Sequence, residues 1–587
     1  MFLAARQIRF FLPVLLAALA APSAAQKATG RPAADRLYQQ GVQSAQKGDL
    51  VAAQAKFEKL VKLAPDFPEG HNSLGWVLFS SGKIGEGIAQ LRMALKLKPG
   101  FVAAHINLAN ALSAKGDHDD AVTEARTAVK LAPGDAEAHR ALGKTLSFQP
   151  DLSAALAELK QALRLDPSRA DLHDDVGALL ARNSQFDEAA AEFTEGLRLQ
   201  PGSPAIKFHL GVVRWTQRSF EAALPLLRSA AELAPGNAQA HYYLARALSD
   251  TGDSDGTIRE LQTTVQLQPD FPEAQNQLGL ALQHKGDGDA AVAAFRRVVE
   301  SQPDNADAHN NLGLALIQVG DAPGSIPEFQ AALRLNPKDV SYRGNLGIGY
   351  LQKADFDAAV EEFQTAIRSA PDDVTLHYNL GLALKLKDQL PAAVAELQKA
   401  AQLDPNQADV HYTLGVTLWQ QGEFARAAAE LRAAISARPD YAEAFYTLGT
   451  VLKQQGNLPD AAAALREAVR LQPDFAGAHT TLAGVLRQLG DSEGAAAESK
   501  LGAEITKNTN ALQAATFSTN SGRRLLNTGD LEGAIFQLRA ALQQVPSYAP
   551  AHFYLGQALQ RKGLTADAKL EFQRASELDS HFKIPPK

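Results

Sequence analysis

Residues Asp307–Pro337 read DAHNNLGLALIQVGDAPGSIPEFQAALRLNP, and they contain one complete structural unit. Small and apolar residues recur at helical spacing on both sides of a break at Gly320 and Asp321. The aspartate is placed to cap the helix that follows, and Pro337 closes the unit because proline cannot continue a helix. The sequence therefore predicts two short antiparallel helices joined by a tight turn. The expected inner faces carry His309, Leu312, Gly313 and Leu316 in the first helix, and Ser325, Phe329 and Ala332 in the second.

The same unit recurs every 34 residues, and a glycine or alanine at one position of the first helix marks it. A glycine inside a helix costs about 1 kcal/mol relative to alanine, so we expect close contact between helices at this marker residue. A fixed period of this size indicates a stacked repeat array and leaves no room for a separate catalytic domain, so we expect no enzyme activity. The marker residues are Gly41, Gly75, Ala109, Gly143, Gly177, Gly211, Ala245, Gly279, Gly313, Gly347, Gly381, Gly415, Gly449 and Ala483, and after five extra residues Gly522 and Gly556.

Sixteen such units resemble the tetratricopeptide repeat (TPR) family. The shared features are the period, a leucine before the marker residue, a small residue in the second helix, a large apolar residue four positions later and a closing proline. The resemblance implies an all-α, right-handed superhelix of about sixteen helix-turn-helix repeats whose first helices line a concave groove. It also implies a scaffold that binds a protein or an extended peptide in that groove. We expect units 1–14 over residues 34–509, an insertion over 510–514, units 15–16 over 515–582, and a tail over 583–587.

Two kinds of departure from the pattern are informative. Unit 14 has Ser499 in place of the large apolar residue and Lys507 in place of the closing proline, so we predict a joint at the five extra residues that separates the last two units. Units 4–6 lack the turn glycine and carry Pro150, Ser184 and Arg218 there instead.

Residues 1–25 differ from the array in composition. A basic start, an uncharged apolar run and small residues before Gln26 predict a secretory signal peptide cleaved near Ala25. Residues 26–33 would then form a short linker, and the protein would be exported to the periplasm or secreted. The alternative is that the segment is retained as an N-terminal anchor.

Composition excludes several classes of function. The chain has no cysteine, which removes disulfides, thiolate metal sites and cysteine nucleophiles. Its net charge is −7, without a basic patch, so we expect no nucleic-acid partner. We also find no Gly-rich phosphate loop, zinc-protease motif or nucleophile elbow, so no small-molecule cofactor is expected.

Ten of the fourteen histidines stand four residues before a marker residue. A metal ladder is excluded, because first helices of neighbouring units lie about 8–10 Å apart while zinc–nitrogen bonds are about 2.0–2.1 Å long. We expect these histidines to occupy a half-buried position between helices. They are His71, His105, His139, His173, His241, His309, His377, His411, His479 and His552.

A stripe of aromatic residues runs beside the expected buried face of the first helices. By the family's geometry these side chains point into the groove, where aromatic rings with a polar group suit binding. Packing between adjacent first helices is the alternative, and the composition of the stripe does not decide between the two. The candidate binding residues are Trp76, Trp215, Tyr378, Tyr412, Trp419 and Tyr446.

Asn311, Asn345 and Asn379 stand two residues before the marker residue in three successive units. An amide both donates and accepts hydrogen bonds, which matches a peptide backbone. This resembles the asparagine ladder in the repeat domain of O-GlcNAc transferase, although only three rungs are consecutive here. The alternative is that they are solvated polar residues on the groove wall.

These observations together predict a non-catalytic scaffold of the cell envelope that holds a protein or extended peptide along the groove. The alternative is a structural subunit of an envelope complex, such as secretion or polysaccharide-export machinery, that works through its ends or convex face. Self-association through the C-terminal unit is a further expectation. Acidic residues at several first-helix positions favour a basic or neutral partner over an acidic one. These are Glu69, Glu137, Asp171, Glu273, Asp307, Asp409 and Glu443.

Overall fold

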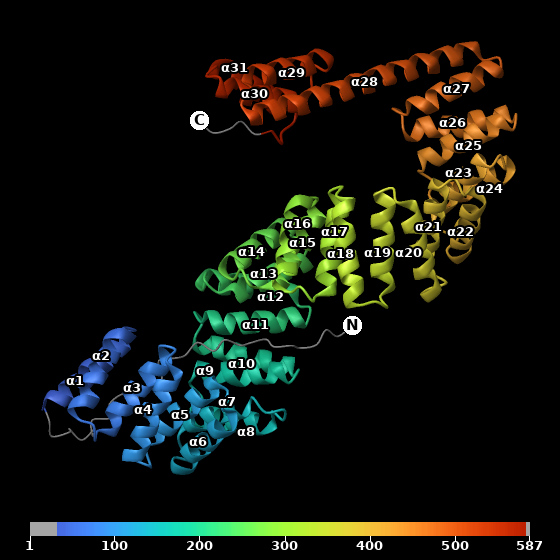
Figure 1. The fold of residues 1–587 in the computed structure, drawn as a ribbon. Helices are drawn as coiled ribbons and strands as arrows, with labels where there is room; N and C mark the ends of the chain where they lie inside the picture. The colour runs from blue at the N-terminus through green and yellow to red at the C-terminus, as the bar shows by residue number, and fades with distance from the viewer. Residues whose placement is uncertain (1–31, 583–587) are drawn as a thin grey trace. The chain divides into compact units, whose positions relative to one another are not determined.

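The computed structural model describes residues 32–582, which form thirty-one α-helices, α1 to α31, and no strand. The helices follow one another mostly as antiparallel hairpins (Figure 1), and the described chain divides into two compact parts, residues 32–303 and 304–582. The predicted all-α repeat architecture is confirmed. The expected signal peptide over 1–25, nearly all of the linker and the tail over 583–587 lie outside the described residues.

The first part holds units 1–8. Its helices are α1 (Pro32–Gln46), α2 (Leu50–Leu63), α3 (Pro68–Ser80), α4 (Ile84–Leu97), α5 (Val102–Lys115), α6 (His118–Leu131), α7 (Ala136–Leu146), α8 (Ser153–Leu165), α9 (Ala170–Arg182), α10 (Phe186–Leu199), α11 (Pro204–Thr216), α12 (Phe220–Leu233), α13 (Ala238–Asp250), α14 (Ser254–Leu267), α15 (Pro272–Lys285) and α16 (Gly288–Ser301).

The second part holds units 9–16. Its helices are α17 (Ala306–Gln318), α18 (Ala322–Leu335), α19 (Val340–Gln352), α20 (Phe356–Ser369), α21 (Val374–Leu386), α22 (Leu390–Leu403), α23 (Ala408–Gln420), α24 (Phe424–Ala437), α25 (Ala442–Gln454), α26 (Leu458–Leu471), α27 (Ala476–Gln488), α28 (Ser492–Thr528), α29 (Leu531–Gln544), α30 (Ala549–Arg561) and α31 (Thr565–Leu578).

The marker residue is small because the second helix of the same unit lies against it. A Cβ added at Gly313 would come within 2.5 Å of the Phe329 ring, and one at Gly381 within 2.6 Å of Leu397. Both large side chains are fully buried. The glycines therefore allow a close helix contact that buries a large apolar side chain of the second helix, which offsets their low helix propensity.

The turn between the two helices has the geometry that its residues predict. Asp321 accepts a hydrogen bond of 2.9 Å from the Gly324 backbone N–H, and Gly320 has φ +83°. Where the turn glycine is missing, Ser184 and Arg218 adopt φ +60° and +58° at the same position. The turn is therefore kept in these units at the cost of a strained backbone.

Helix α28 departs from the hairpin pattern. It runs without interruption over 37 residues and supplies both the second helix of unit 14 and the first helix of unit 15 (Figure 1). Lys507 stands where most units have the closing proline, so nothing stops the helix there. The five extra residues over 510–514 are helical and do not form a separate insertion. That this stretch is a protease-sensitive joint stays a prediction.

Among the described residues, no helix combines the length and the apolar character that crossing a membrane requires.

Candidate binding surface on the first helices

Polar side chains join the first helices of neighbouring units. Asn107 donates a hydrogen bond of 2.9 Å to Asn72, and Asn345 donates one of 2.8 Å to Asn310. In both pairs the donor lies two residues before its marker residue, and the acceptor lies three residues before the marker residue of the preceding unit. The first helices therefore present a surface whose polar groups already serve the packing between units.

The three asparagines of the predicted ladder have different surroundings. Asn311, Asn345 and Asn379 are all half-buried, and Asn345 is committed to Asn310. The side-chain amide of Asn379 makes no hydrogen bond to any residue between 32 and 582. Asn379 is thus better placed than Asn345 to bind a peptide backbone, because it gives up no bond.

The three tryptophans also differ. Trp76 is only 5% exposed and belongs to a core cluster with Leu74 and Val77. Trp215 and Trp419 are half-buried, and each indole N–H donates a 2.6 Å hydrogen bond to the first helix of the next unit, to Asp250 and to Gln454 respectively. The position of Trp76 is explained by packing in the core, whereas part of the Trp215 and Trp419 rings stays accessible to a partner.

The predicted aromatic residues of units 11–13 come together. Tyr378 on α21, Tyr412 and Trp419 on α23, and Tyr446 on α25 pack against one core cluster and remain partly exposed. We call these four residues the aromatic row. The ring of Tyr412 lies 5.0 Å from that of Tyr441 between centroids. Because rigid backbone elements hold these rings at consecutive units, the row offers preorganised apolar area with polar groups at its edges.

A second aromatic cluster was only partly predicted. The Tyr243 ring lies 5.7 Å from both the Phe208 and Trp215 rings, and the Arg246 guanidinium lies 4.9 Å from the Trp215 ring. Burial raises the pKa of the Tyr243 hydroxyl. Sequence reasoning missed Tyr243 and Arg246, although the latter lies four residues after Tyr242 and therefore on the same face of α13.

A charged network on α7 and α9 was also missed. Arg140 is 6% exposed and forms ion pairs with Asp175 and, at 3.0 Å, with Asp171. Arg169 contacts Asp171 at 2.7 Å. Burial lowers the pKa of Lys144 at the edge of the network. These charges neutralise one another, so the network joins α7 to α9 and does not give this surface one sign of charge.

Most acids of the first helices are paired locally. Glu69 contacts Lys98 at 2.9 Å, and Asp409 contacts Arg438 at 2.7 Å, a bond that lowers the pKa of the aspartate. Asp307 accepts a hydrogen bond from the Tyr342 hydroxyl. These three acids give only weak support for a basic partner, because lysine, arginine or tyrosine side chains of the array already bind them.

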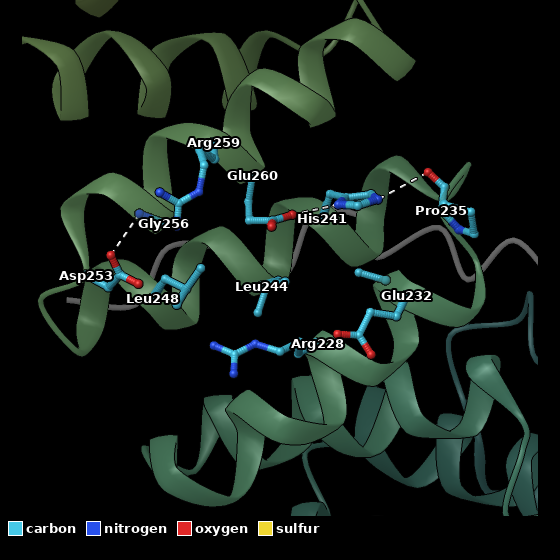
Figure 2. A pocket seen from close by; sticks show the side chains of 11 residues that line it. Arg228, Glu232, Pro235, His241, Leu244, Leu248, Asp253, Gly256, Arg259 and Glu260 are labelled. Atoms are coloured by element: carbon cyan, nitrogen blue, oxygen red, sulfur yellow. Dashed lines mark hydrogen bonds and ion pairs between the residues drawn. The ribbon is translucent and has the colours of Figure 1, made fainter. Parts of the chain in front are cut away.

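The repeated histidines lie inside a hydrogen-bond chain, as Figure 2 shows for His241. Its Nδ1 lies 2.7 Å from a Glu260 carboxylate oxygen, and its Nε2 lies 3.2 Å from the carbonyl oxygen of Pro235. The carbonyl only accepts hydrogen bonds, so Nε2 is the nitrogen that donates to Pro235, while Nδ1 faces the carboxylate of Glu260. The described residues contain no group of three or more potential metal ligands. The histidines therefore join the two helices of a unit to its preceding turn.

The glutamate varies together with the histidine inside this one chain. Nine of the ten histidines have a glutamate nineteen residues later, and His71 has Gln90. Gln275 and Phe445 replace the histidine in two units, where Ala294 and Ala464 replace the glutamate, whereas in unit 10 Arg343 replaces the histidine and forms a 2.8 Å ion pair with the retained Glu362. The two positions act as a structural pair. This pairing explains why the histidine recurs, and no bound ligand is needed to explain it.

Family models described as tetratricopeptide repeat match residues 38–145, 175–340 and 412–501, and one described as TPR repeat matches 349–422 and 522–563. The chain is a tetratricopeptide repeat protein. No curated protein is significantly similar in sequence to the whole chain.

Several solved structures are similar to this chain. YrrB, whose structure is described as a TPR protein with an unusual peptide-binding site, is 26% identical, with 32% of this chain and 96% of YrrB covered and a TM-score of 0.28. MamA from Desulfovibrio magneticus RS-1 is 24% identical, with coverage of 29% and 96% and a TM-score of 0.28. Yeast Tom70 is 18% identical, with coverage of 72% and 96% and a TM-score of 0.31.

The C-terminal unit was expected to mediate self-association. Its Phe572 is buried against Gly556 and within 5.7 Å of the Phe553 ring, between centroids. Phe572 therefore holds α30 and α31 together and is not available to a partner, while self-association itself stays a prediction.

Proposed function

We propose that the protein is an exported, non-catalytic scaffold that binds a protein or an extended peptide through the aromatic row on α21, α23 and α25. Tetratricopeptide repeat proteins generally act as scaffolds for protein partners, which agrees with this proposal. The observation that carries it is the row itself, because four partly exposed aromatic side chains recur on consecutive first helices over one rigid core. Tyrosine and tryptophan are enriched among the few residues that dominate the binding energy of protein interfaces.

Site-specific cross-linking tests the proposal. A benzophenone amino acid at Tyr412 is expected to give discrete protein adducts in cells, whereas one at Ala429, on the exposed face of α24, is not. Partner capture should fall at least about tenfold with Tyr378→Ala combined with Tyr446→Ala. The matched control Phe536→Ala removes an exposed ring on α29 and should leave capture unchanged. Equal adducts at Tyr412 and Ala429 would contradict the proposal.

Export is tested separately. The sequence predicts that the mature protein begins at Gln26, which N-terminal sequencing of protein from the envelope fraction checks. A chain that keeps its first 25 residues would favour the anchored alternative.

The alternative role in assembly has one observation of its own. Phe536 and Leu570 occupy the same position of units 15 and 16, fourteen residues after the marker residue, and are 70% and 65% exposed. The other fourteen units carry alanine, threonine, proline, arginine or glutamate there. This exposed apolar pair suits a protein contact on the second helices. Loss of complex formation in Phe536→Ser with Leu570→Ser, but not in Tyr412→Ala, would favour the assembly role.

A further inference from the structure

Neighbouring units pack through one recurring contact. The residue nineteen positions after the marker residue of one unit meets the residue five positions before the next marker residue; we call these two residues the junction pair. A Cβ added at Gly196 would lie 3.1 Å from Ile206, and one at Gly70 would lie 3.1 Å from Leu60. In both junction pairs a glycine accommodates a large neighbour, so the sizes of the two residues are matched.

The second member of the junction pair is buried almost everywhere. It is buried in fourteen of the sixteen units, and the two exceptions are Arg36 in unit 1 and Phe517 in unit 15. Arg36 begins the array, and a charged residue suits an end that has no neighbour. Phe517 is 73% exposed, so the contact that this repeat position makes in the other units is not made within this chain.

The complementary site for this ring is Gly502 of unit 14. A Cβ added at Gly502 would meet the Thr480 hydroxyl at 2.9 Å, and the carbonyl oxygen of Ala476 and the Cβ of His479, both at 3.3 Å. Gly196 shares two of these neighbours in unit 5, Ala170 and His173, but its nearest atom belongs to Ile206 of the following unit. Gly502 is buried as well, and the Thr480 side chain of its own unit, not a residue of a following unit, lies nearest to it.

One chain cannot bring the two residues together while α28 is intact. Gly502 and Phe517 lie on the same helix, fifteen residues and about 22 Å apart. Neighbouring helices in the array are antiparallel, so a second α28 that runs antiparallel to the first would place Phe517 of each copy against Gly502 of the other. Both contacts then form at once around a two-fold axis near residues 509 and 510.

We propose that a second copy of this chain covers Phe517, and that two copies exchange units 15–16 so that each pair stacks on unit 14 of the other. The register agrees with the unit 5–6 junction, where Phe193 lies 5.6 Å from His209 between ring centroids. The corresponding residues of α28 are Ser499 and Asn520, which are both polar and able to hydrogen-bond. The proposal is independent of the aromatic row on α21, α23 and α25.

The absence of cysteine makes a direct test simple. The full chain carrying Ser499→Cys and Asn520→Cys is oxidised with copper phenanthroline and run on a non-reducing gel, beside both single variants. The exchanged dimer predicts a covalent dimer for the double variant and little for either single variant. A disulfide within one monomer would overturn the proposal in favour of a bent α28, and free thiols would overturn it outright.

Light scattering of the cysteine-free protein provides the second measurement. We expect a doubled molar mass that returns to that of the monomer in Phe517→Ser, with dimer affinity at least about tenfold weaker. Leu233→Ser, at a 51% exposed residue on α12 that has no part in either proposed contact, should leave the dimer intact. A monomeric parent protein, or a dimer lost equally in both variants, would contradict the exchange.

Discussion

The junction between units 5 and 6 and the junction between units 14 and 15 contain similar residues in different arrangements. Each pairs a glycine with a large apolar residue, Gly196 with Ile206 and Gly502 with Phe517. In the first, Pro201 follows α10 and the chain turns back, so the pair is in contact. In the second, Lys507 allows α28 to continue and the pair is separated. A helix stop therefore decides whether two matched units stack within one chain.

The two junctions should differ most in the stability that is lost when the large apolar residue is replaced, because Ile206 is buried and Phe517 is exposed. Ile206→Ala should lower the local stability of α10 and α11 by about 3–4 kcal/mol, because it leaves a cavity at a fully packed contact. Phe517→Ala should change the stability of α28 and α29 by less than about 0.5 kcal/mol in dilute, monomeric protein. Hydrogen exchange of the two regions measures both effects. Similar losses at the two positions would show that Phe517 is covered within its own chain.

The second prediction restores a proline at position 507, where the chain has Lys507 and the helix does not end. Lys507→Pro removes a helical hydrogen bond and places the ring against the preceding turn, at a cost of about 3 kcal/mol, so α28 should break there. Hydrogen exchange over residues 503–511 should rise sharply. Lys507→Ala, which favours a helix, is the matched control and should leave exchange slow. Equal protection in both variants would contradict the role given to this position.

The His–Glu pair provides a smaller effect, which distinguishes unit 11 from unit 13. Glu396→Ala should cost about 1–2 kcal/mol, because it leaves His377 with an unsatisfied ring nitrogen. Adding His377→Phe reproduces the pair of unit 13, Phe445 with Ala464, and should recover most of the loss. A double-mutant cycle in urea measures the coupling. Additive losses would mean that the two positions do not act as a pair.

The smallest effect concerns the turns. Arg218 holds φ +58° where most units have glycine, so Arg218→Gly should stabilise unit 6 by about 0.5–1 kcal/mol. Gly252→Ala, at the same turn of unit 7, should destabilise that unit by about 1 kcal/mol. Urea titration of each variant gives the sign. A destabilised Arg218→Gly protein would mean that the arginine side chain contributes more than its backbone strain costs.

Much of the fold could be predicted because each unit repeats the same local rules. The glycine against Phe329, the Asp321 cap and the stop before Pro337 each follow from a short stretch of sequence, and the structure confirms all three. The continuity of α28 was not predicted, although the loss of proline at Lys507 was recognised as a departure. A missing stop signal leaves both a bent loop and a longer helix open, and the surrounding sequence does not decide between them.

The candidate site was harder to predict, because the same repeat positions can serve either packing between units or binding at the surface. Trp76 and Tyr412 stand close together in the repeat pattern, yet the structure buries the first in a core and leaves the second partly exposed. Arg140 and Asp175 belong to different units, and only stacking brings them together. Burial and pairing between units depend on the neighbouring unit, so a position within the repeat does not specify them.

A distance across α28 tests the central claim most directly. Nitroxide labels on cysteines at Lys500 and Arg524, both exposed, can be measured by double electron–electron resonance in labelled protein diluted with unlabelled protein. A continuous helix places these positions about 36 Å apart, and we predict one narrow distribution near that value. A distribution centred below about 20 Å, well short of the continuous-helix span, would show that α28 bends and that units 14 and 15 stack within one chain.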